Sequence, residues 1–355
     1  MSDITIKDIA RECGVGVSTV SRAINNHPDI NPETRNRIMK VIREKGYVPN
    51  DSARYLKRSE TNNIALLVKG ISNQFFTDII QEIEKEVEEH SYALILRHVS
   101  APDDEVLTAQ ALVKERKLKG IIFLGGNFTH DEAMLEQVGV PFVFATVGED
   151  PKEADSIEQE RSARKIRYAN IAVDDVQASF DAAEYLIQLG HEKIGLVAEG
   201  IEIPSIGQLR YRGFCRALQQ HGIEFQEDRV YDVKEGIEHF SFSNGYHAAK
   251  ELLNRCPDLT AIFCFSDVLA MGAARAIMDS NREIPEDVSL LGFDGIEMGE
   301  YMNPRLSTMS QPSKEIADEA VHTLFGMIED EEKPVDRIMN AKLTVRESTG
   351  KVMHG

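Results

Sequence analysis

The stretch TIKDIARECGVGVSTVSRAINN, residues 5–26, contains two short amphipathic segments separated by glycines. Thr5 followed by Asp8 matches the start of a capped helix. Apolar residues then recur at helical spacing, at Ile6, Ile9, Ala10 and Cys13. Because GVG at 14–16 interrupts this pattern, we expect a first helix to end there and a second helix to begin near Val17.

A third helix is expected after the segment NHPDI (26–30). Asn31 can cap this helix, and Pro32 suits its first position. Its buried stripe would consist of Ile38, Val41 and Ile42. Two short helices joined by a glycine turn and supported by a third helix are typical of a helix-turn-helix domain, which we place at residues 1–50.

The second helix has a largely polar outer face. Val20 and Ile24 fall on its inner side. The residues expected on its outer side are Val17, Ser18, Ser21, Arg22 and Asn25. Short side chains would let the helix enter the major groove of DNA, and Arg22 could donate two hydrogen bonds to a guanine. The same spacing also fits an ordinary three-helix bundle with a solvated polar face.

The negative charge of the chain is unevenly distributed. The formal net charge is −19, yet residues 1–60 hold 11 Lys and Arg against 8 Asp and Glu, a balance of +3. The remaining residues carry −22. Salt screens charges over about 8 Å under physiological conditions, so an acidic body does not prevent a local contact between the N-terminal part and DNA.

The segment YVPNDSARYLKRSETNN (47–63) predicts a short hinge helix and linker at 51–62. Asn50 can cap a helix over about 51–57, which would carry Ala53, Arg54, Leu56 and Lys57. Isolated helices shorter than about 12 residues are marginal in water, so this one would order on DNA. Leu56 could then insert between base pairs in the minor groove. The alternative is a plain linker with an incidental leucine.

The rest of the chain, residues 63–355, alternates apolar runs with amphipathic, helix-length stretches. The runs are IALLVK, YALILRH, GIIFLGG, PFVFAT, NIAVD, KIGLVAE, TAIFCFSD and VSLLGFD. This alternation predicts an α/β fold with doubly wound parallel sheets. A division near residue 170 suggests two lobes. A ligand would bind between the lobes, at the carboxyl ends of the strands.

Residues near expected strand ends, and Arg210 at the start of the helix stretch RYRGF (210–214), are candidates for such a ligand site. They are Asn73, Phe75, Phe76, Thr146, Arg210, Phe240, Asp267, Asp294 and Gln311. Carboxylates, an arginine and amides beside aromatic faces suit a polyhydroxylated or heterocyclic ligand. Each residue also has a structural alternative, since the phenylalanines fit a core and an Asp after a strand is often a helix cap. In HFSFSNGY (239–246), Phe242 is an alternative to Phe240.

Signatures of catalysis are missing from the sequence. There is no phosphate-binding loop, no zinc-protease or hydrolase nucleophile motif, and no histidine spacing typical of metal ligands. The four cysteines are scattered, as expected for free thiols in a reducing cytosol. No apolar run approaches the roughly 18 residues of a membrane span, and the N-terminus is no signal peptide. We expect a cytoplasmic protein that is not an enzyme, has no membrane partner, and needs neither a cofactor nor a metal.

One segment, GEDPKEADSIEQERSARKIRYA (148–169), is long and rich in both charges. We expect a solvated excursion between two strands. A flap over the ligand site or a docking surface for a partner is the alternative.

Three stretches together resemble the LacI/GalR family of bacterial transcriptional regulators. They are TIKDIARECGVGVSTVSRAINN (5–26), NPETRNRIMKVIREKGYVPNDSARYLKR (31–58) and DVSLLGFDG (287–295). The resemblance runs the length of the chain and is most specific in the first sixty residues. It implies a helix-turn-helix headpiece, a hinge helix, and a two-lobed effector-binding core like that of periplasmic sugar-binding proteins. It also implies that the last part of the chain, about 295–355, crosses between the lobes. The expected N-lobe is then about 63–169 plus 295–322, and the expected C-lobe is about 170–294 plus 323–355.

The family motif also implies roles for individual residues. Base-reading positions are Val17, Ser18 and Arg22. Supporting or phosphate-contact positions are Thr19, Ser21, Asn25, Asn31, Thr34, Tyr47 and Asn50, and the hinge contributes Ala53, Leu56 and Lys57. The family usually has Ser where this chain has Gly16, and glycine lacks a side-chain oxygen for a cap or a phosphate contact. Thr146 stands where many relatives have an aspartate.

These observations predict a ligand-responsive transcriptional repressor that binds a pseudo-palindromic operator in double-stranded DNA as a homodimer. The small-molecule effector would be a carbohydrate, with a purine-type effector or corepressor as the alternative. A sugar-binding protein or an enzyme of the same core class is the runner-up. Because the chain ends soon after LTVREST (343–349), without a heptad tail, we expect a dimer rather than a tetramer.

Overall fold

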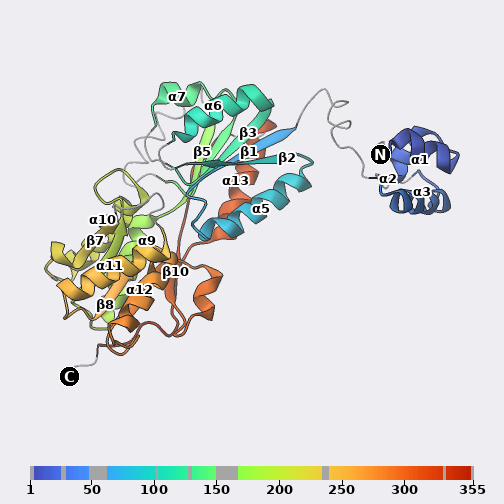
Figure 1. Cartoon of the computed structure of the whole chain (residues 1–355). Coiled ribbons are helices and arrows are strands. Elements are labelled where there is room, and N and C mark those ends of the chain that lie inside the picture. The colour runs from blue at the N-terminus through green and yellow to red at the C-terminus, as the bar shows by residue number, and fades with distance from the viewer. Residues whose placement is uncertain are drawn as a thin grey trace. The chain divides into compact units, whose positions relative to one another are not determined.

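The computed structural model describes residues 4–24, 29–47, 62–100, 103–126, 130–148, 167–233, 240–330 and 333–352. These fall into two compact units, Met1–Thr61 and Asn62–Gly355, shown in Figure 1. The expected hinge helix and almost all of the charged segment 148–169 lie outside the described residues.

The first unit is a three-helix domain, which we call the headpiece. Its helices are α1 (Ile6–Cys13), α2 (Val17–Ile24) and α3 (Pro32–Lys45). The backbone N–H of Thr5 donates to the Asp8 carboxylate (3.0 Å), so the predicted cap forms. Gly14, with φ of 63°, then ends α1. The headpiece core contains the fully buried Val20, Ala23 and Ile38. The predicted helix-turn-helix arrangement is confirmed.

The second unit, which we call the core unit, contains two six-stranded sheets. The first sheet has the order β11-β5-β4-β3-β1-β2, and all its strands are parallel. Its strands are β1 (Asn63–Lys69), β2 (Ala93–Val99), β3 (Leu118–Leu124), β4 (Phe142–Ala145), β5 (Tyr168–Val173) and β11 (Arg337–Met339). Its helices are α5 (Phe75–Glu89), α6 (Glu105–Arg116), α7 (Glu132–Glu136) and α13 (Ser313–Ile328).

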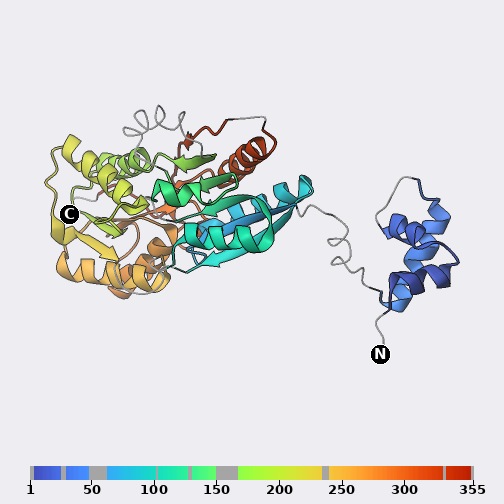
Figure 2. The same cartoon turned by 90° about the horizontal axis from the view of Figure 1, so that it is seen from above.

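The second sheet has the order β12-β10-β9-β8-β6-β7, and only β12 runs antiparallel to its neighbour. Its strands are β6 (Ile194–Glu199), β7 (Val230–Val233), β8 (Ala261–Cys264), β9 (Ser289–Asp294), β10 (Ser307–Ser310) and β12 (Lys342–Thr344). The helices of this lobe are α9 (Asp175–Gln188), α10 (Ile206–Gln220), α11 (Phe242–Arg255) and α12 (Asp267–Asp279), with short 3-10 turns at Glu227–Arg229 and Glu297–Tyr301. In both lobes helices cover the two faces of the sheet (Figure 1, Figure 2).

The chain crosses between the lobes three times, and the expected lobe boundaries are wrong at each crossing. The expected bounds put 170–173 in the second lobe, but this segment is part of β5 and pairs with β4 of the first sheet. They put 307–310 in the first lobe, but this segment forms β10 beside β9. The segment 323–339 completes α13 and β11 of the first lobe. Strand pairing between distant residues, rather than local pattern, decides where each crossing occurs.

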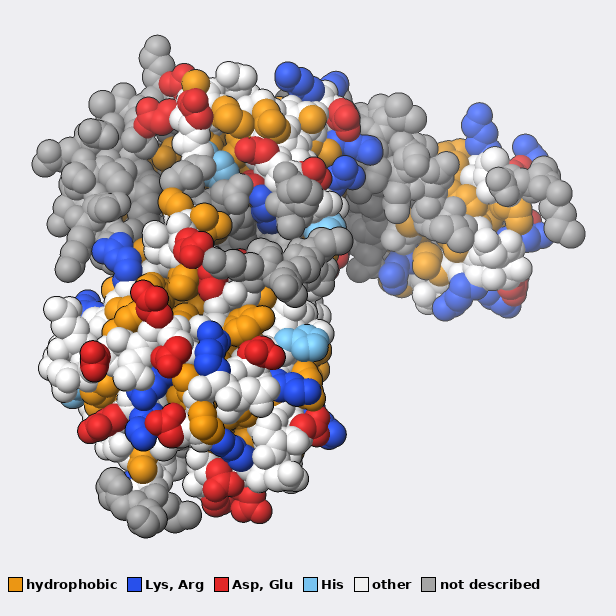
Figure 3. Space-filling model, turned by 60° about the vertical axis from the view of Figure 1, so that its left-hand side comes forward, with side chains coloured by type: hydrophobic (Ala, Val, Ile, Leu, Met, Phe, Trp, Pro, Cys, Tyr) orange, Lys and Arg blue, Asp and Glu red, His pale blue; other side chains and the backbone are white. Residues whose placement is uncertain are grey.

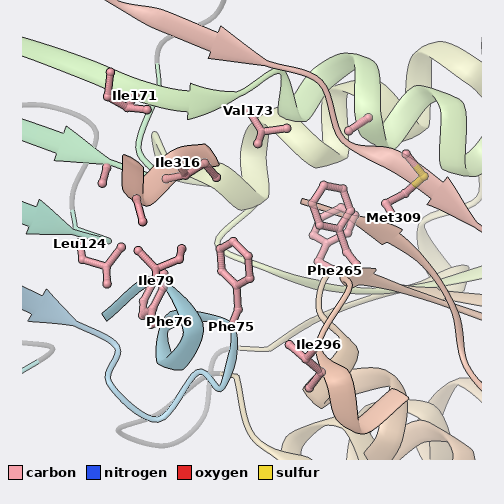
Figure 4. Close-up of a cluster of buried hydrophobic side chains, with 14 of the residues drawn as sticks. Phe75, Phe76, Ile79, Leu124, Ile171, Val173, Phe265, Ile296, Met309 and Ile316 are labelled. Carbon is pink, nitrogen blue, oxygen red and sulfur yellow. The ribbon is translucent and has the colours of Figure 1, made fainter. Parts of the chain in front are cut away.

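A single cluster of buried side chains extends from the first lobe into the second. It joins residues of α5 and α13, such as Ile79 and Ile316, to Phe265 and Met309 of the second lobe. Figure 4 shows Phe75 lying between these two groups. The apolar contact therefore continues across the junction of the lobes.

The surface of the core unit carries both charges. On the face in Figure 3, acidic and basic side chains are interspersed over both lobes. None of the helices among the described residues is both long and apolar enough to cross a membrane.

Candidate functional site

The outer face of α2 exposes the side chains that the sequence assigns to base reading. Ser18 and Arg22 are exposed, and Val17 leaves 40% of its surface accessible, a large fraction for an apolar side chain. Thr19 and Ser21 are half-buried. Because Val20 and Ala23 on the opposite side are fully buried, the orientation of the helix is fixed by the headpiece core.

Three further predicted DNA-contact residues belong to the frame of the headpiece. The side-chain oxygen of Asn31 accepts from the backbone N–H groups of Glu33 (2.8 Å) and Thr34 (3.4 Å), which caps α3. Tyr47 is half-buried against the headpiece core. Their contacts with DNA stay predictions. Outside the described residues lie the remaining predicted contacts, Asn25, Asn50, Ala53, Leu56 and Lys57.

Polar residues meet at the carboxyl ends of the strands of the second lobe. Arg210 Nη1 donates to the carbonyl oxygen of Phe265 and lies 3.9 Å from Asp294 Oδ1. Gln311 Nε2 donates to the same Asp294 oxygen at 2.8 Å. The guanidinium carbon of Arg210 stands 3.6 Å from the centre of the Phe293 ring. Three of the predicted site residues, Arg210, Asp294 and Gln311, thus form one network.

Asp294 is the most unusual residue of this network. It is 3% exposed, and its φ of 116° lies in a region that non-glycine residues rarely adopt. Such strain clusters at functional sites. Its Oδ2 has no hydrogen-bond partner among the described residues. Burial raises the pKa of Asp294 to about 8, although Arg210 opposes this rise. A carboxyl group that is mostly neutral near pH 7 can donate as well as accept a hydrogen bond.

Asp267 supports the loop that carries Asp294. Its Oδ2 accepts from the backbone N–H groups of Gly295 (2.8 Å) and Ile296 (2.9 Å). Its Oδ1 accepts from the hydroxyl of Thr308 at 2.7 Å. Burial raises the pKa of Asp267 to about 7. Both of its oxygens are therefore used within the protein, and its contact with an effector stays a prediction.

Sequence reasoning missed Asp175, which completes the network. Asp175 is 3% exposed, and its Oδ1 accepts from Arg210 Nε at 2.8 Å. The available signal was VDD (173–175), in which acids directly follow a strand. The neighbouring Asp174 caps α9 by accepting from the Gln177 N–H (2.9 Å), which is the ordinary role of an acid at that position. Sequence alone does not separate the cap from the arginine partner.

The predicted residues of the first lobe are engaged in its own structure. Asn73 Oδ1 accepts from the Phe75 N–H at 3.1 Å, at the start of α5. Phe75 and Phe76 are buried in the cluster that joins the lobes, as the core alternative had it. Thr146, with φ of 69°, accepts from the Gly125 N–H at 3.2 Å. These residues follow β1 and β4 at their carboxyl ends, and their contacts with an effector stay predictions.

The two aromatic candidates near residue 240 differ in exposure. Phe240 is half-buried against the cluster formed by α11, α12 and their sheet face. Phe242 is the first residue of α11 and is 45% exposed. The structure does not bring Phe240 into the Arg210 network, so its stacking on a ligand stays a prediction.

A second group of polar side chains, in the first lobe, was also not predicted. Lys69 Nζ lies 2.9 Å from Glu105 Oε2 and donates to the carbonyl of Asp103. His130 Nε2 lies 3.3 Å from Glu105 Oε1, and its ring stacks on Phe144 with centroids 5.3 Å apart. Lys69, Glu105 and His130 come from distant parts of the sequence, so no local motif could reveal this group.

Comparison with known proteins agrees with both units. Residues 5–50 match the family model described as bacterial regulatory proteins, lacI family, and residues 183–349 match a periplasmic binding protein-like domain. The HTH-type transcriptional regulator MalR of Clostridium butyricum is 35% identical, over 97% of this chain and 99% of the relative. The HTH-type transcriptional repressor CytR of Escherichia coli is 32% identical, over 97% of this chain and 96% of the relative.

Solved structures give the same result. A lac repressor dimer bound to operator has a TM-score of 0.73 and 22% identity, covering 98% of this chain and 100% of the other, which supports the fold. A CelR–cellobiose complex, described as a transcriptional regulator, has a TM-score of 0.68 and 27% identity, covering 97% and 99%. With its helix-turn-helix headpiece, its two-lobed core and these full-length relatives, the chain belongs to the LacI family of bacterial transcriptional regulators.

Proposed function

We propose that this regulator is a repressor whose operator affinity responds to a sugar or sugar derivative bound between the lobes. The observation that carries the proposal is the network of Arg210, Asp294 and Gln311, in which a buried carboxyl oxygen lacks a partner. Hydrogen-bond donors and acceptors beside the Phe293 ring suit a polyhydroxylated ligand. Solved relatives that carry cellobiose (27% identical) and ribose (25% identical) support this class of ligand.

On DNA, two headpieces of a homodimer would read the two half-sites of a pseudo-palindromic operator. Val17, Ser18 and Arg22 would contact base edges, because they lie on the exposed side of α2. Paired hinge segments would form helices on the operator, and Leu56 from each would open a central base step. Leu56→Ala should then weaken operator binding while leaving effector binding unchanged, and an unaltered DNA bend would contradict the wedge role.

The effector would act by binding one arrangement of the lobes more tightly than the other. Only such differential affinity can change the affinity for operator, and a coupling of about 1–3 kcal/mol is typical. The crossing segments carry this coupling, since Gln311 lies between β10 of one lobe and α13 of the other.

A thermal-shift screen of cellobiose, ribose, other sugars, sugar phosphates and nucleobases tests the class of effector. A compound that raises the unfolding temperature should also change the operator affinity measured by fluorescence anisotropy. A response confined to nucleobases would replace the sugar by the purine alternative. A response to none of these compounds would contradict the proposed class of ligand.

Substitutions locate the site. Arg210→Ala and Asp294→Ala should abolish the response to the compound found while keeping operator binding. Arg216→Ala is the matched control, because Arg216 belongs to the same helix and stacks on Phe180 instead. Normal affinity for the compound in both site variants, measured by calorimetry, would place the effector elsewhere.

A further inference from the structure

The side chain of Arg210 is held in one position by several contacts. Its Nε donates to Asp175 at 2.8 Å, its Nη1 donates to the Phe265 carbonyl, and its flat face lies against Phe293. The side chains of Arg210 and Asp175 are 5% and 3% exposed, so water contributes little to their solvation. The charge of Arg210 is therefore balanced mainly by Asp175 at short range.

A second acid stands near the same guanidinium without bonding to it. Asp294 Oδ1 lies 3.9 Å from Arg210 Nη1, beyond hydrogen-bond range, whereas a charged N–H···O pair normally closes to about 2.7–2.9 Å. Asp294 Oδ2 has no partner in the described part of the chain. The buried guanidinium of Arg210 and the buried carboxyl of Asp294 thus remain unbonded, although a small movement would bring them within hydrogen-bond distance.

We propose that Asp175 is a positioning residue, which holds Arg210 away from Asp294 and so leaves both side chains available to the effector. This rests on the proposed function, in which Arg210 and Asp294 bind that effector. Without Asp175, the nearest carboxylate to the guanidinium among the described residues is Asp294. Arg210 would then pair with Asp294, and a ligand would have to break that ion pair before it could bind.

The position of Asp175 in the chain also makes its ion pair with Arg210 depend on the arrangement of the lobes. Asp175 opens α9, directly after β5 of the first lobe, while Gln311 lies in the second crossing. The Asp294 site is therefore bounded on two sides by residues of crossing segments. A lobe rotation that displaces the start of α9 would move Arg210 with it, so the geometry of the site depends on the arrangement of the lobes.

Titration of the Asp294 carboxyl tests the proposal without any effector. In full-length protein labelled with 13C at the aspartate side-chain carboxyl, the Asp294 signal is assigned by its loss in Asp294→Asn. Its pKa, about 8 in the unmodified protein, should fall by about 1 to 3 in Asp175→Ala, because the repulsion from Asp175 is removed and Arg210 then pairs with Asp294. Asp175→Asn keeps an acceptor for Nε but no charge, so it should give a smaller fall. A crystal structure of Asp175→Ala should show Arg210 within about 3 Å of an Asp294 oxygen.

Asp181→Ala is the matched control, since Asp181 lies on α9 but bonds to Gln177 rather than to Arg210. It should leave the Asp294 titration unchanged. An unchanged Asp294 pKa in Asp175→Ala overturns the proposal, and if that variant does not fold, an unchanged pKa in Asp175→Asn does so. A general loss of stability would not move this titration.

The two proposals fail separately. If Arg210→Ala and Asp294→Ala do not affect binding of the screened compound, the proposed effector site is wrong, whatever Asp294 does in the Asp175 variants. If they abolish binding, Asp175→Ala should weaken it by about tenfold, as expected for blocking a hydrogen bond to a charged group. Full affinity in Asp175→Ala would then count against positioning by Asp175 alone.

Discussion

Asp294 links the stability of the core unit to pH. Its pKa in the folded chain, about 8, lies above its ordinary value of 3.8. A group with a raised folded pKa contributes most to stability below its unfolded pKa, and the contribution is lost as pH rises through the folded pKa. Between the unfolded and the folded pKa, the free energy of unfolding falls by about 1.4 kcal/mol for each pH unit. Part of the free energy of unfolding should therefore disappear between about pH 6 and pH 8.

Asp294→Asn removes this titration, so the free energy of unfolding of the variant should fall less over the same interval. Urea denaturation at the two pH values measures the difference. Asp258→Asn is a suitable control in the same lobe, because its exposed pair with Lys193 lowers the pKa of Asp258. Equal pH dependence in Asp294→Asn and the unmodified protein would show that Asp294 is ionised at neutral pH.

Arg22 should determine sequence preference rather than general affinity for DNA. Arg22 is exposed on the outer face of α2, because Val20 is buried on the opposite side of the helix. Arg22→Ala should cost about 1–3 kcal/mol on the operator and much less on unrelated DNA. Arg11→Ala, on α1, serves as the control for loss of positive charge. An equal loss on all sequences in a binding assay would instead make Arg22 a phosphate contact.

Individual site residues differ in how far the sequence could identify them. Asp294 and Gln311 follow expected strands and Arg210 begins the helix stretch RYRGF (210–214), and the structure brings the three together. Asp175 also follows a strand, but its partner Arg210 is 35 positions away and the pairing depends on the packing of α9 on α10. A local signal cannot report a contact that two helices create together.

At the scale of elements, α11 and α12 pack at very short range. A Cβ on Gly245 would stand 2.1 Å from the carbonyl oxygen of Leu269, and one on Gly272 would stand 2.1 Å from that of Phe242. Because each glycine has no side chain, the backbone of the other helix can approach it closely. Gly245→Ala or Gly272→Ala should force the helices apart and lower the free energy of unfolding by about 1–3 kcal/mol, measured by chemical denaturation.

Asn254→Ala, at an exposed position of α11, should change that stability little. Unfolding curves of the glycine variants that overlay the curve of the unmodified protein would mean that the helices can separate without cost.

The elements themselves were largely predictable, because eight strands, most of them buried, coincide with the apolar runs of the sequence. The strands β7, VYDV, and β11, RIM, were not predicted. Both lie at or near a sheet edge and are mostly exposed or half-buried, so their sequences lack the continuous apolar pattern of a central strand. Lobe membership was less predictable than strand identity, since it is set by pairing across more than a hundred residues, as for β11 with β5.

At the scale of the whole molecule, the C-terminal segment joins distant parts of the second lobe. Leu290 N donates to the Ser348 carbonyl (2.7 Å), and Ser307 N donates to the Ser348 hydroxyl (2.8 Å). The carbonyl of Gly350 accepts from His191 Nε2 at 3.0 Å. Deletion of residues 347–355 should remove these bonds and cost about 3–5 kcal/mol of unfolding free energy.

Deletion of residues 353–355 alone is the control for this experiment and should leave the denaturation midpoint in place. If the longer deletion also left it in place, the segment would be an accessory rather than a structural part of the lobe.

The three crossings have a consequence for the order in which the protein matures on the ribosome. The strand β11 completes the first sheet, and α13 is one of the helices that cover it. The first lobe therefore cannot fold completely until synthesis has passed Met339. The headpiece core, in contrast, is built, in the described part of the chain, from side chains between Ile6 and Tyr47. Domains generally fold as units and from the N-terminus during translation. A nascent or prematurely terminated chain would therefore carry the operator-reading unit long before it could carry either half of the sensor.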